Sequence, residues 1–451
     1  MKFENLYDYQ QKAVVDIRGE IQRKNKRILL RQECGAGKTV ISSYLAAQIY
    51  QRKKRLYFVV HRRELLEQAS KTFRKFGIPH GIIAPGFTPS NHNIQVASVF
   101  TLVNRLDKVP KPDMVIFDEC QYAVSNTWIK CIEHFGDIIS IGLSATPIRL
   151  DGKGFEDIFD VMVNGPSMKE LIKKGKLCNF NYYAPPTKID FSELTMSGND
   201  FNPESVEKAI DKPTITGDLI QHYKELIPGK RAIGFSPTVK HCYTLSEEFR
   251  RAGINAAAID GNDEKNRIQA VQDFRDNKLQ VLFNVNIVSE GMDIQGMDAV
   301  IDTNPTQSLA RFVQRGSRCL RSDPENPDKV ATILDHSSNI YTHGAIDADR
   351  EWSLKGGKKN KPKQTDEEKS IAIRQCSECY AIHPTAPECP ACGFVYQIKA
   401  RDYKQVDGKL VQIDYDKIER EQAEKKEKQD RKYEVSAAKS LEELMLLEVD
   451  G

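Results

Sequence analysis

The stretch Gln32-Glu33-Cys34-Gly35-Ala36-Gly37-Lys38-Thr39 decides the fold class of the first third of this chain. It follows the apolar run 27–30 and precedes residues 40–50, whose pattern predicts a helix. Its glycines let backbone N–H groups approach phosphate oxygens, and the start of a helix adds partial positive charge there. This context predicts a P-loop, in which Lys38 holds the β- and γ-phosphates and Thr39 binds Mg²⁺.

Short β-branched runs alternate with helical-looking stretches on both sides of this loop, which predicts an α/β fold with parallel sheets. Two such blocks follow one another. The predicted strands of the first block are 27–30, 56–60, 94–97, 114–117 and 138–143. Those of the second block are 231–235, 255–259, 281–285, 299–302 and 331–334. Two sheets imply two domains.

Length and composition agree with this division. The chain has 451 residues, enough for two sizeable cores and small appendages. With 40% hydrophobic and 29% charged residues and no apolar run long enough to cross a bilayer, it is not expected in a membrane. The polar start of the sequence predicts a cytoplasmic protein without an export signal. The net charge of +3 means that any affinity for nucleic acid must come from local basic patches.

An acidic turn supplies the second half of a nucleotide site. Asp118-Glu119-Cys120-Gln121 follows the apolar run 114–117, so its carboxylates lie at the carboxyl end of a buried strand, where open α/β sheets bind ligands. Asp118 is expected to bind Mg²⁺ through water, and Glu119 to accept a proton from the attacking water. Acidic turns after strands are common, so this assignment depends on the P-loop upstream.

Four of the ten cysteines form a separate pattern near the C-terminal end. Two C-x₂-C pairs separated by nine residues suit a tetrahedral Zn²⁺ site better than a disulfide or an iron–sulfur cluster. We therefore predict a zinc ribbon over 372–400, whose role is either purely structural or DNA-contacting. Its ligands would be Cys376, Cys379, Cys389 and Cys392. The six other cysteines are expected to be small core residues.

Changes in composition predict the domain boundaries. The periodicity weakens after residue 150, and we place the domain join near 165, which gives an ATP-binding domain at 1–165 and a second domain at 166–350. Residues 351–371 include a basic stretch rich in lysine and glycine that predicts a linker. Residues 401–451 form a charged tail with a predicted solvated helix.

The motifs together resemble superfamily 2 helicases and translocases of the DEAD/DEAH type, most of all RadD-like, XPB-like and UvsW-like DNA motors. The resemblance covers residues 1 to about 350 and implies two tandem RecA-like domains. Residues 6–10 match the segment in which a glutamine recognises adenine, which places Tyr9 and Gln10 in the nucleotide site. Residues 61–68 and 98–102 resemble strand-binding motifs and imply contacts to nucleic acid from Arg62, Arg63, Ser98 and Thr101. Residues 144–147 match motif III, which links the nucleotide state to strand binding.

The second block is similar to the remaining motifs of the same superfamily. Residues 234–238 resemble motif IV, which implies strand contacts from Ser236 and Thr238. Residues 289–293 resemble motif V, with Ser289 implied on the strand and Gly291 and Asp293 on the nucleotide. Residues 314–321 resemble motif VI and carry Arg318 and Arg321, three apart and so expected on one helical face. Two arginines on a helix are usually solvated. After a complete first-domain motif set we expect both to act as arginine fingers on the γ-phosphate.

Four positions depart from the family pattern. Gln32 replaces the first glycine of the P-loop, Tyr7 stands where arginine is common, and Ser317 replaces a glycine of motif VI. Gln121 stands where DEAH-type relatives carry histidine, and it cannot become charged near neutral pH. Coupling between sites is expected to differ, whereas hydrolysis need not.

These observations predict an ATP-dependent DNA helicase or translocase that uses ATP, Mg²⁺ and Zn²⁺ and acts on single-stranded, forked or branched DNA. Repair or recombination proteins are the expected partners, with a monomer as the expected state. Unwinding or branch migration follows from family analogy alone. The alternatives are an RNA helicase, a restriction-type translocase subunit and a non-catalytic nucleic-acid-binding ATP switch.

Overall fold

The computed structural model describes residues 2–122, 126–149, 154–185, 194–198, 200–210, 213–285 and 296–355, with short segments at 373–375, 382–384, 411–412 and residue 420. The chain divides into two compact units, Met1–Gly356 with Gly408–Gly451, and Gly357–Asp407. Several predicted features lie outside the described residues: Ser289, Gly291 and Asp293 of motif V, all four zinc cysteines, and the tail helix apart from residue 420.

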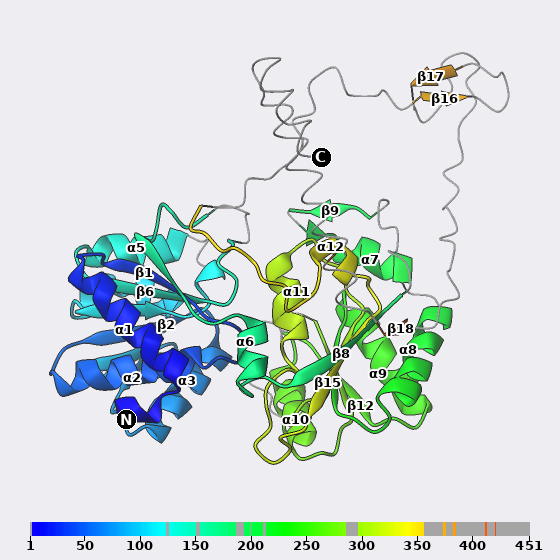
Figure 1. Ribbon diagram of the computed structural model, residues 1–451, viewed down its shortest axis with the longest axis horizontal. Helices are drawn as coiled ribbons and strands as arrows, with labels where there is room; N and C mark the ends of the chain where they lie inside the picture. Colours follow the sequence, from blue (N-terminus) through cyan, green and yellow to red (C-terminus); the bar gives the residue numbers. More distant parts are fainter. Residues whose placement is uncertain are drawn as a thin grey trace, which may run out of the picture. The chain divides into compact units, whose positions relative to one another are not determined.

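The first lobe is a seven-stranded parallel sheet in the order β3-β4-β2-β5-β6-β1-β7. Figure 1 labels β2, β6 and β1 of this sheet. The five predicted strands are present, and the structure adds the edge strands β3 and β7. The bounds are β1 Arg27–Arg31, β2 Leu56–Val60, β3 Gly81–Ile83, β4 Ile94–Ser98, β5 Met114–Phe117, β6 Ile139–Ser144 and β7 Val161–Asn164. The helices are α1 Asp8–Gln22, α2 Lys38–Gln51, α3 Arg63–Lys75, α4 Val99–Val103 and α5 Asn126–Phe135.

Both faces of this sheet are covered, which explains why its strands are continuously apolar. Alternate strand residues such as Ile28 and Phe58 pack with α1, α2 and α3, whereas Leu29 and Tyr57 pack with α5 on the other face. Figure 1 shows α5 on the side of the sheet opposite α1 and α2. The sheet is therefore a fixed frame whose carboxyl edge presents the loops that follow β1 and β5.

The second lobe is a sheet in the order β12-β13-β11-β14-β15-β8-β18, parallel except for β18. All five predicted strands are present. The bounds are β8 Asn179–Ala184, β11 Ala232–Phe235, β12 Ala256–Ile259, β13 Val281–Asn284, β14 Ala299–Asp302, β15 Val330–Asp335 and β18 Val411–Gln412. The helices are α6 Met168–Lys173, α7 Pro203–Ile210, α8 Pro213–Leu226, α9 Val239–Arg251, α10 Glu264–Arg275, α11 Leu309–Gly316 and α12 Ile340–His343.

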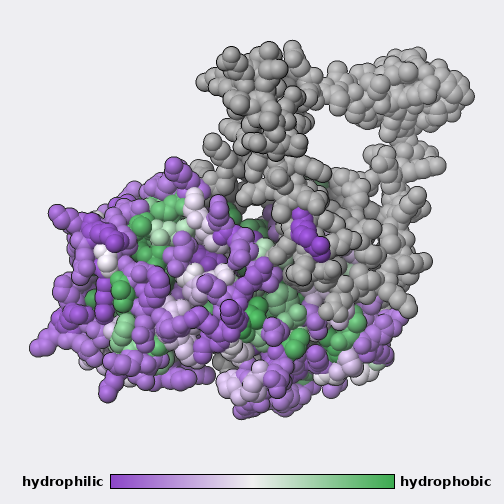
Figure 2. Space-filling view, in the orientation of Figure 1, coloured by the Kyte–Doolittle hydropathy of each residue, from purple (hydrophilic) through white to green (hydrophobic). Residues whose placement is uncertain are grey.

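Two short strand pairs complete the described sheets. A two-stranded pair, β9 Met196–Ser197 and β10 Asp200–Phe201, precedes α7, and another, β16 Ile373–Gln375 and β17 Ile382–Pro384, lies in the second unit. In the described part of the chain, no helix combines the length and apolarity needed to cross a membrane. Figure 2 shows mainly hydrophilic residues on the described surface, with apolar residues in small separate areas. Most large apolar side chains accordingly lie in the cores of the lobes.

The chain changes lobe between β7, which pairs with β1, and β8, which pairs with β15. The predicted join near 165 lies within this connection. Two ion pairs join the lobes, one between Lys174 and Asp8 and one between Arg267 and Glu64 at 3.0 Å. Partly exposed pairs of this kind contribute little free energy. Buried apolar side chains also pack between the lobes, where Tyr9 and Ala36 belong to one cluster with Leu177.

Candidate nucleotide-binding site

The P-loop connects β1 to α2, and its conformation depends on two glycines. Gly35 and Gly37 have φ values of 83° and 84°, in the left-handed region that side-chain-bearing residues rarely adopt. A Cβ on Gly37 would lie 2.4 Å from the Gln10 side-chain nitrogen, and one on Gly35 would lie 3.0 Å from Leu177 Cδ2. Helix α2 begins at Lys38, so the first turn of the helix follows the loop directly, as a phosphate cradle requires.

Lys38 and the acidic turn after β5 lie together at the carboxyl edge of the first sheet. Lys38 Nζ is 3.5 Å from Glu119 Oε1, and both side chains are largely buried. Glu119 has a φ of 51°, a left-handed conformation that is strained for a glutamate. The tertiary fold therefore holds this carboxylate in place against its local preference.

The pKa values of the two carboxyl groups of this turn are shifted in opposite directions. Burial, and then the charge of Glu119, raise the pKa of Asp118 to about 7. Burial alone would raise the pKa of Glu119 as well, but Lys38, the Gln121 amide and Arg318 hold it below its usual value. Glu119 is thus the ionised member and suits a proton acceptor. Asp118 is a buried carboxyl group whose ionisation a divalent cation would favour, so the donor set fits Mg²⁺ with Thr39 as a second oxygen ligand.

Gln121 connects the acidic turn to β6. Its Nε2 donates to Glu119 Oε2 at 2.5 Å, and its Oε1 accepts from Ser144 Oγ at 2.7 Å. Ser144 Oγ in turn accepts from the backbone N–H of Thr146 at 3.1 Å. The glutamine therefore links the acidic turn to motif III.

The segment around Gln10 lies against the P-loop. Gln10 Nε2 donates to the carbonyl of Ala36 at 3.2 Å, and Gln10 Oε1 accepts from the backbone N–H of Tyr7 at 3.1 Å. Tyr9 is buried in a cluster that includes Leu177 of the second lobe. Tyr7 has the more exposed ring in this segment. Lys176 Nζ lies over that ring, 3.7 Å from its centroid. The adenine contact implied for Gln10 and Tyr9 remains a prediction.

Motif VI reaches the P-loop from the second lobe, but not from a helical face as we expected. Helix α11 ends at Gly316, so Arg318 and Arg321 lie in the segment after it. Gly316, the last residue of the helix, packs closely on the chain near residue 346, because a Cβ on it would lie 2.2 Å from Ile346 Cδ1. Arg321 instead forms a β-bridge with Leu177, and its carbonyl accepts from Lys329 Nζ at 2.9 Å.

Both arginines nevertheless face the first lobe. A Cβ on Gly35 would lie 3.6 Å from Arg321 Cγ, which places this side chain against the P-loop. The charge of Arg318 lowers the pKa of Glu119, so the guanidinium is close to the acidic turn. Ser317, which replaces the expected glycine, is accommodated by donating its Oγ to the Val313 carbonyl at 2.5 Å.

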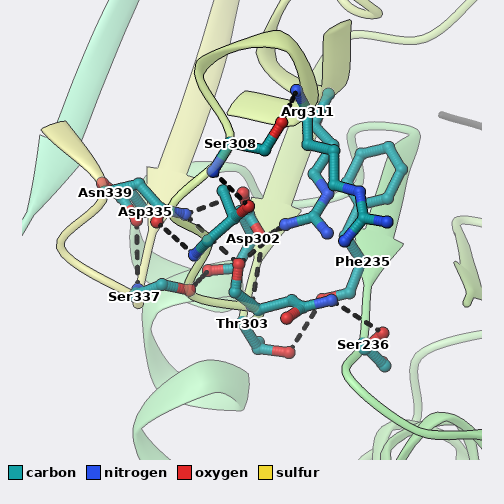
Figure 3. A network of polar contacts seen from close by, with 12 residues as sticks. Phe235, Ser236, Asp302, Thr303, Ser308, Arg311, Asp335, Ser337 and Asn339 are labelled. Atoms are coloured by element: carbon teal, nitrogen blue, oxygen red, sulfur yellow. Dashed lines mark hydrogen bonds and ion pairs between the residues drawn. The ribbon is translucent and has the colours of Figure 1, made fainter. Parts of the chain in front are cut away.

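A buried polar network holds the start of α11 (Figure 3). Asp302, at the end of β14, accepts from Asn339 Nδ2 at 3.2 Å and pairs with Arg315 at 3.4 Å. Arg315 is 1% exposed and also donates to the Asn304 carbonyl at 2.7 Å. Asp335 accepts from the Tyr182 hydroxyl at 2.8 Å. Because buried charges are costly unless paired, this network fixes the helix from which the motif VI arginines follow.

The predicted strand-contacting residues fall into two groups. Arg62 precedes α3 and Arg63 begins it, with Arg63 Nε 3.2 Å from Glu67. Ser98 precedes α4, and Thr238 caps α9 by accepting from the N–H of His241. These residues lie at helix N-termini, where backbone N–H groups attract phosphate.

Thr101 and Ser236 form the other group, because they are 9% and 1% exposed. In this conformation the buried Ser236 side chain therefore cannot contact a nucleic-acid strand, contrary to our expectation. Sequence reasoning also missed His61, at the end of β2. Burial lowers its pKa to about 4, and Glu119 opposes that shift, so its ring is near the acidic turn. No spacing signal in the sequence joins His61 to Glu119, since only the pairing of β2 with β5 brings them together.

Two family descriptions match the chain in the order of its lobes. The description "Type III restriction enzyme, res subunit" matches residues 3–149, and "Helicase conserved C-terminal domain" matches residues 212–323. A 51.5 kDa protein of a Lactococcus phage is 31% identical over 395 residues, which cover 86% of this chain and 83% of that protein. A protein named ATP-dependent helicase IRC3, from Saccharomyces cerevisiae, is 29% identical over 341 residues, or 70% of this chain and 49% of the yeast protein. The chain thus spans most of the phage protein and about half of the yeast one.

Solved structures agree on the fold. A structure described as a fragment of an HsdR subunit of a type I restriction enzyme from Vibrio vulnificus matches with a TM-score of 0.60 at 19% identity, over 75% of this chain and 65% of that chain. The restriction-modification enzyme LlaBIII bound to DNA matches at 0.52 with 15% identity, over 73% of this chain and 27% of that chain. Together with the two family descriptions and the phage relative, these findings show that the chain belongs to the superfamily 2 helicases, with two tandem RecA-like lobes.

Proposed function

We propose that this protein is an ATP-dependent DNA translocase or helicase whose ATP hydrolysis is stimulated by nucleic acid. The observation that carries the proposal is the position of Arg318 and Arg321, which approach the P-loop and Glu119 from the second lobe. A site divided between two lobes ties the chemistry of the nucleotide to their relative movement.

The residues divide the chemical work as follows. Bound ATP and Mg²⁺ supply the triphosphate and the cation that neutralises it. Lys38 and the backbone N–H groups of the P-loop bind the phosphates, with Thr39 and Asp118 orienting the metal. Glu119, held ionised beside Lys38, accepts the proton of the attacking water. The two arginines stabilise charge that develops on the transferred phosphoryl group.

Alternation of the two lobes between a closed and an open arrangement would then move the protein along a nucleic-acid strand. Helix N-termini on both lobes, at Arg62 and Thr238, would contact phosphates, through basic side chains at Arg62 and through the helix start at Thr238. If the distance between these contacts changes in each ATP cycle, the contacts would advance along one nucleic-acid strand.

DNA is our preferred substrate over RNA. The relatives support this choice through their names: one is the EcoAI endonuclease subunit of Escherichia coli, 24% identical over 72% of this chain and 45% of its own length, and LlaBIII was solved with DNA. The structure of Dbp5 with RNA, at a TM-score of 0.51 and 16% identity, keeps the RNA alternative open to test. Within DNA we propose forked and branched molecules, in repair, recombination or replication, in line with the resemblance to RadD-like motors.

We also propose that the second unit binds Zn²⁺ through Cys376, Cys379, Cys389 and Cys392. The C-x₂-C spacing supports this. In the same unit, β16 pairs antiparallel with β17, with Arg374 opposite His383, which is compatible with a ribbon. Elemental analysis of the purified protein should give one zinc per chain, and a Cys376→Ser, Cys379→Ser variant should lose it. Retention of zinc by that variant would contradict this ligand set.

The experiment that tests the function is steady-state ATP hydrolysis with single-stranded, duplex, forked and four-way DNA and with matched RNA. We expect DNA to stimulate hydrolysis more than RNA, with branched DNA strongest. Lys38→Ala serves as the inactive control. RNA stimulation equal to or greater than that of DNA would favour an RNA helicase. Hydrolysis at the background level with every nucleic acid would favour a non-catalytic switch.

A further inference from the structure

Two covalent connections between the lobes within residues 1–355 meet at Arg31, which forms an ion pair with Glu33 where β1 turns into the P-loop. The outgoing connection follows β7 at residues 165–166. The returning connection is residues 344–354, which we name the return segment. Neither connection was part of the sequence motifs, and the function proposed above assigns no role to the side chains of Arg31 and Glu33.

The outgoing connection is held closely against the end of β1. Arg31 Nη1 donates to the carbonyls of Gly165 and Pro166 at 3.3 and 3.2 Å, and the N–H of Gly165 donates to the Arg31 carbonyl at 2.7 Å. A Cβ on Gly165 would lie 2.1 Å from Gln32 Oε1, so no larger residue fits there without movement. The backbone that leaves the first lobe is therefore locked to the first residues of the P-loop.

The first residues of the return segment pack against motif VI. Ile346 is 1% exposed, and its Cδ1 occupies the space that a side chain at Gly316 would need. Arg350 then holds the segment in a compact turn by donating to the carbonyls of Ala345 at 2.7 Å and Ile346 at 3.0 Å. The segment thus takes its position from the end of α11, from which the catalytic arginines follow.

The return segment ends on the first lobe. The ring of Trp352 lies 5.7 Å from Arg31 Cζ, in cation–π geometry. Two residues later the carbonyl of Leu354 accepts from the N–H of Phe155 at 2.6 Å, and its side chain packs against the first-lobe core. The return segment has fewer than a dozen residues, and most of them make specific contacts. It therefore connects motif VI, on which it packs at one end, to the first lobe at the other.

Glu33 completes the junction inside the P-loop. It forms a buried ion pair with Arg31, and the two side chains are 8% and 7% exposed. Burial raises the pKa of Glu33, and the charges of Arg31, Lys38 and Arg350 oppose that shift, so all three cations act on this carboxylate. The Glu33 carbonyl accepts from the N–H of Ala36 at 3.1 Å, which makes it part of the loop that binds phosphate.

We propose that Arg31, Glu33 and Trp352 are positioning residues that transmit the relative movement of the lobes to the P-loop. When motif VI moves with the second lobe, Ile346 moves with it, and Trp352 changes its contact with Arg31. Because Arg31 and Glu33 are a buried pair, a shift of one must be followed by the other, and the phosphate cradle responds. This inference rests on the proposed nucleic-acid-stimulated ATPase.

The test compares Trp352→Ala with Trp352→Phe, which keeps an aromatic face, and with Tyr50→Ala, an exposed aromatic at the end of α2. In the full-length protein we expect Trp352→Ala to lower the ratio of stimulated to basal ATP hydrolysis about fivefold, the factor expected from loss of one partly buried cation–π contact. The other two variants should stay close to the wild-type ratio. A purely structural defect would reduce the active fraction, lower both rates equally and leave the ratio unchanged, which would overturn the proposal.

Fluorescence gives an independent readout, because the sequence has only two tryptophans and Trp128 is buried. In a Trp128→Phe background, emission from Trp352 should change when a non-hydrolysable ATP analogue is added, and less with ADP. The same emission with and without the analogue would refute transmission through this residue. If the wild-type protein shows no stimulation by any nucleic acid, the proposed function fails, and the emission change alone then decides on the positioning role.

Discussion

Gln121 donates its amide to Glu119 at 2.5 Å while accepting from Ser144 at 2.7 Å. One neutral side chain therefore holds the proton acceptor and is tied to the strand that leads into motif III. Because an amide does not titrate, the donor and acceptor groups of Gln121 do not change with pH.

Replacing Gln121 should weaken hydrolysis more than nucleotide binding. Gln121→Ala removes a donor from an ionised carboxylate, and we expect kcat for ATP to fall about tenfold with little change in KM. Gln121→His, which retains a donor, should lose less. The measurement is steady-state ATPase kinetics with saturating DNA. A large rise in KM at constant kcat would show that Gln121 acts in binding instead.

The motif VI arginines should act on the chemical step. Arg318→Ala and Arg321→Ala are each expected to reduce kcat by about 10³-fold, within the range for arginine fingers, with nucleotide affinity changing far less. Arg251→Ala, an exposed arginine on α9, is the matched control and should retain wild-type rates. Equilibrium binding of a fluorescent ATP analogue and single-turnover hydrolysis separate the two effects. Full activity of both variants would remove these residues from the site.

Gly316 should tolerate no side chain. In Gly316→Ala the new Cβ would meet Ile346 Cδ1 at 2.2 Å, and we expect a loss of about 1–3 kcal/mol in the free energy of unfolding. Gly19→Ala on α1 is the control, because nothing lies within 4 Å of its Cβ position, and it should stabilise the protein by about 0.5–1 kcal/mol. Urea unfolding monitored by circular dichroism measures both. Equal stabilities of the two variants would show that the return segment yields at this position.

Acid should destabilise the second lobe through His336. Burial, and then the nearby His222, lower the pKa of His336 to about 3 from its usual 6.5. The unfolded chain binds the proton more tightly, so stability is complete above pH 6.5 and falls as the pH drops towards 3. Because the ring keeps some exposure, we expect this residue to account for about 1 kcal/mol at pH 5.

The variant His336→Gln isolates that contribution, since glutamine is neutral throughout. Its unfolding free energy should depend less on pH between 7.5 and 5 than that of the wild-type protein. Parallel curves for the two proteins would mean that the imidazole does not titrate differently in the folded state.

The sequence predicted ten of the strands and both sheets, because parallel strands covered on two faces must be continuously apolar and this pattern is local. It missed β3 and β7 of the first sheet and β8 and β18 of the second. Gly81–Ile83 is too short to show a period, and Asn179–Ala184 mixes polar residues with aromatic ones. The error over Arg318 and Arg321 was of another kind: their spacing suits a helix, but α11 ends at Gly316, before either of them.

The sequence by itself determined the P-loop, the acidic turn and the order of the motifs, since each depends on neighbouring residues and on the strand before it. Only the tertiary structure decided that Glu119 adopts a left-handed backbone beside Lys38, that Gln121 reaches Ser144, and that Trp352 returns to Arg31. The physical reason is that these contacts join segments far apart in the chain. Their geometry comes from the packing of two sheets, which no local pattern of residues records.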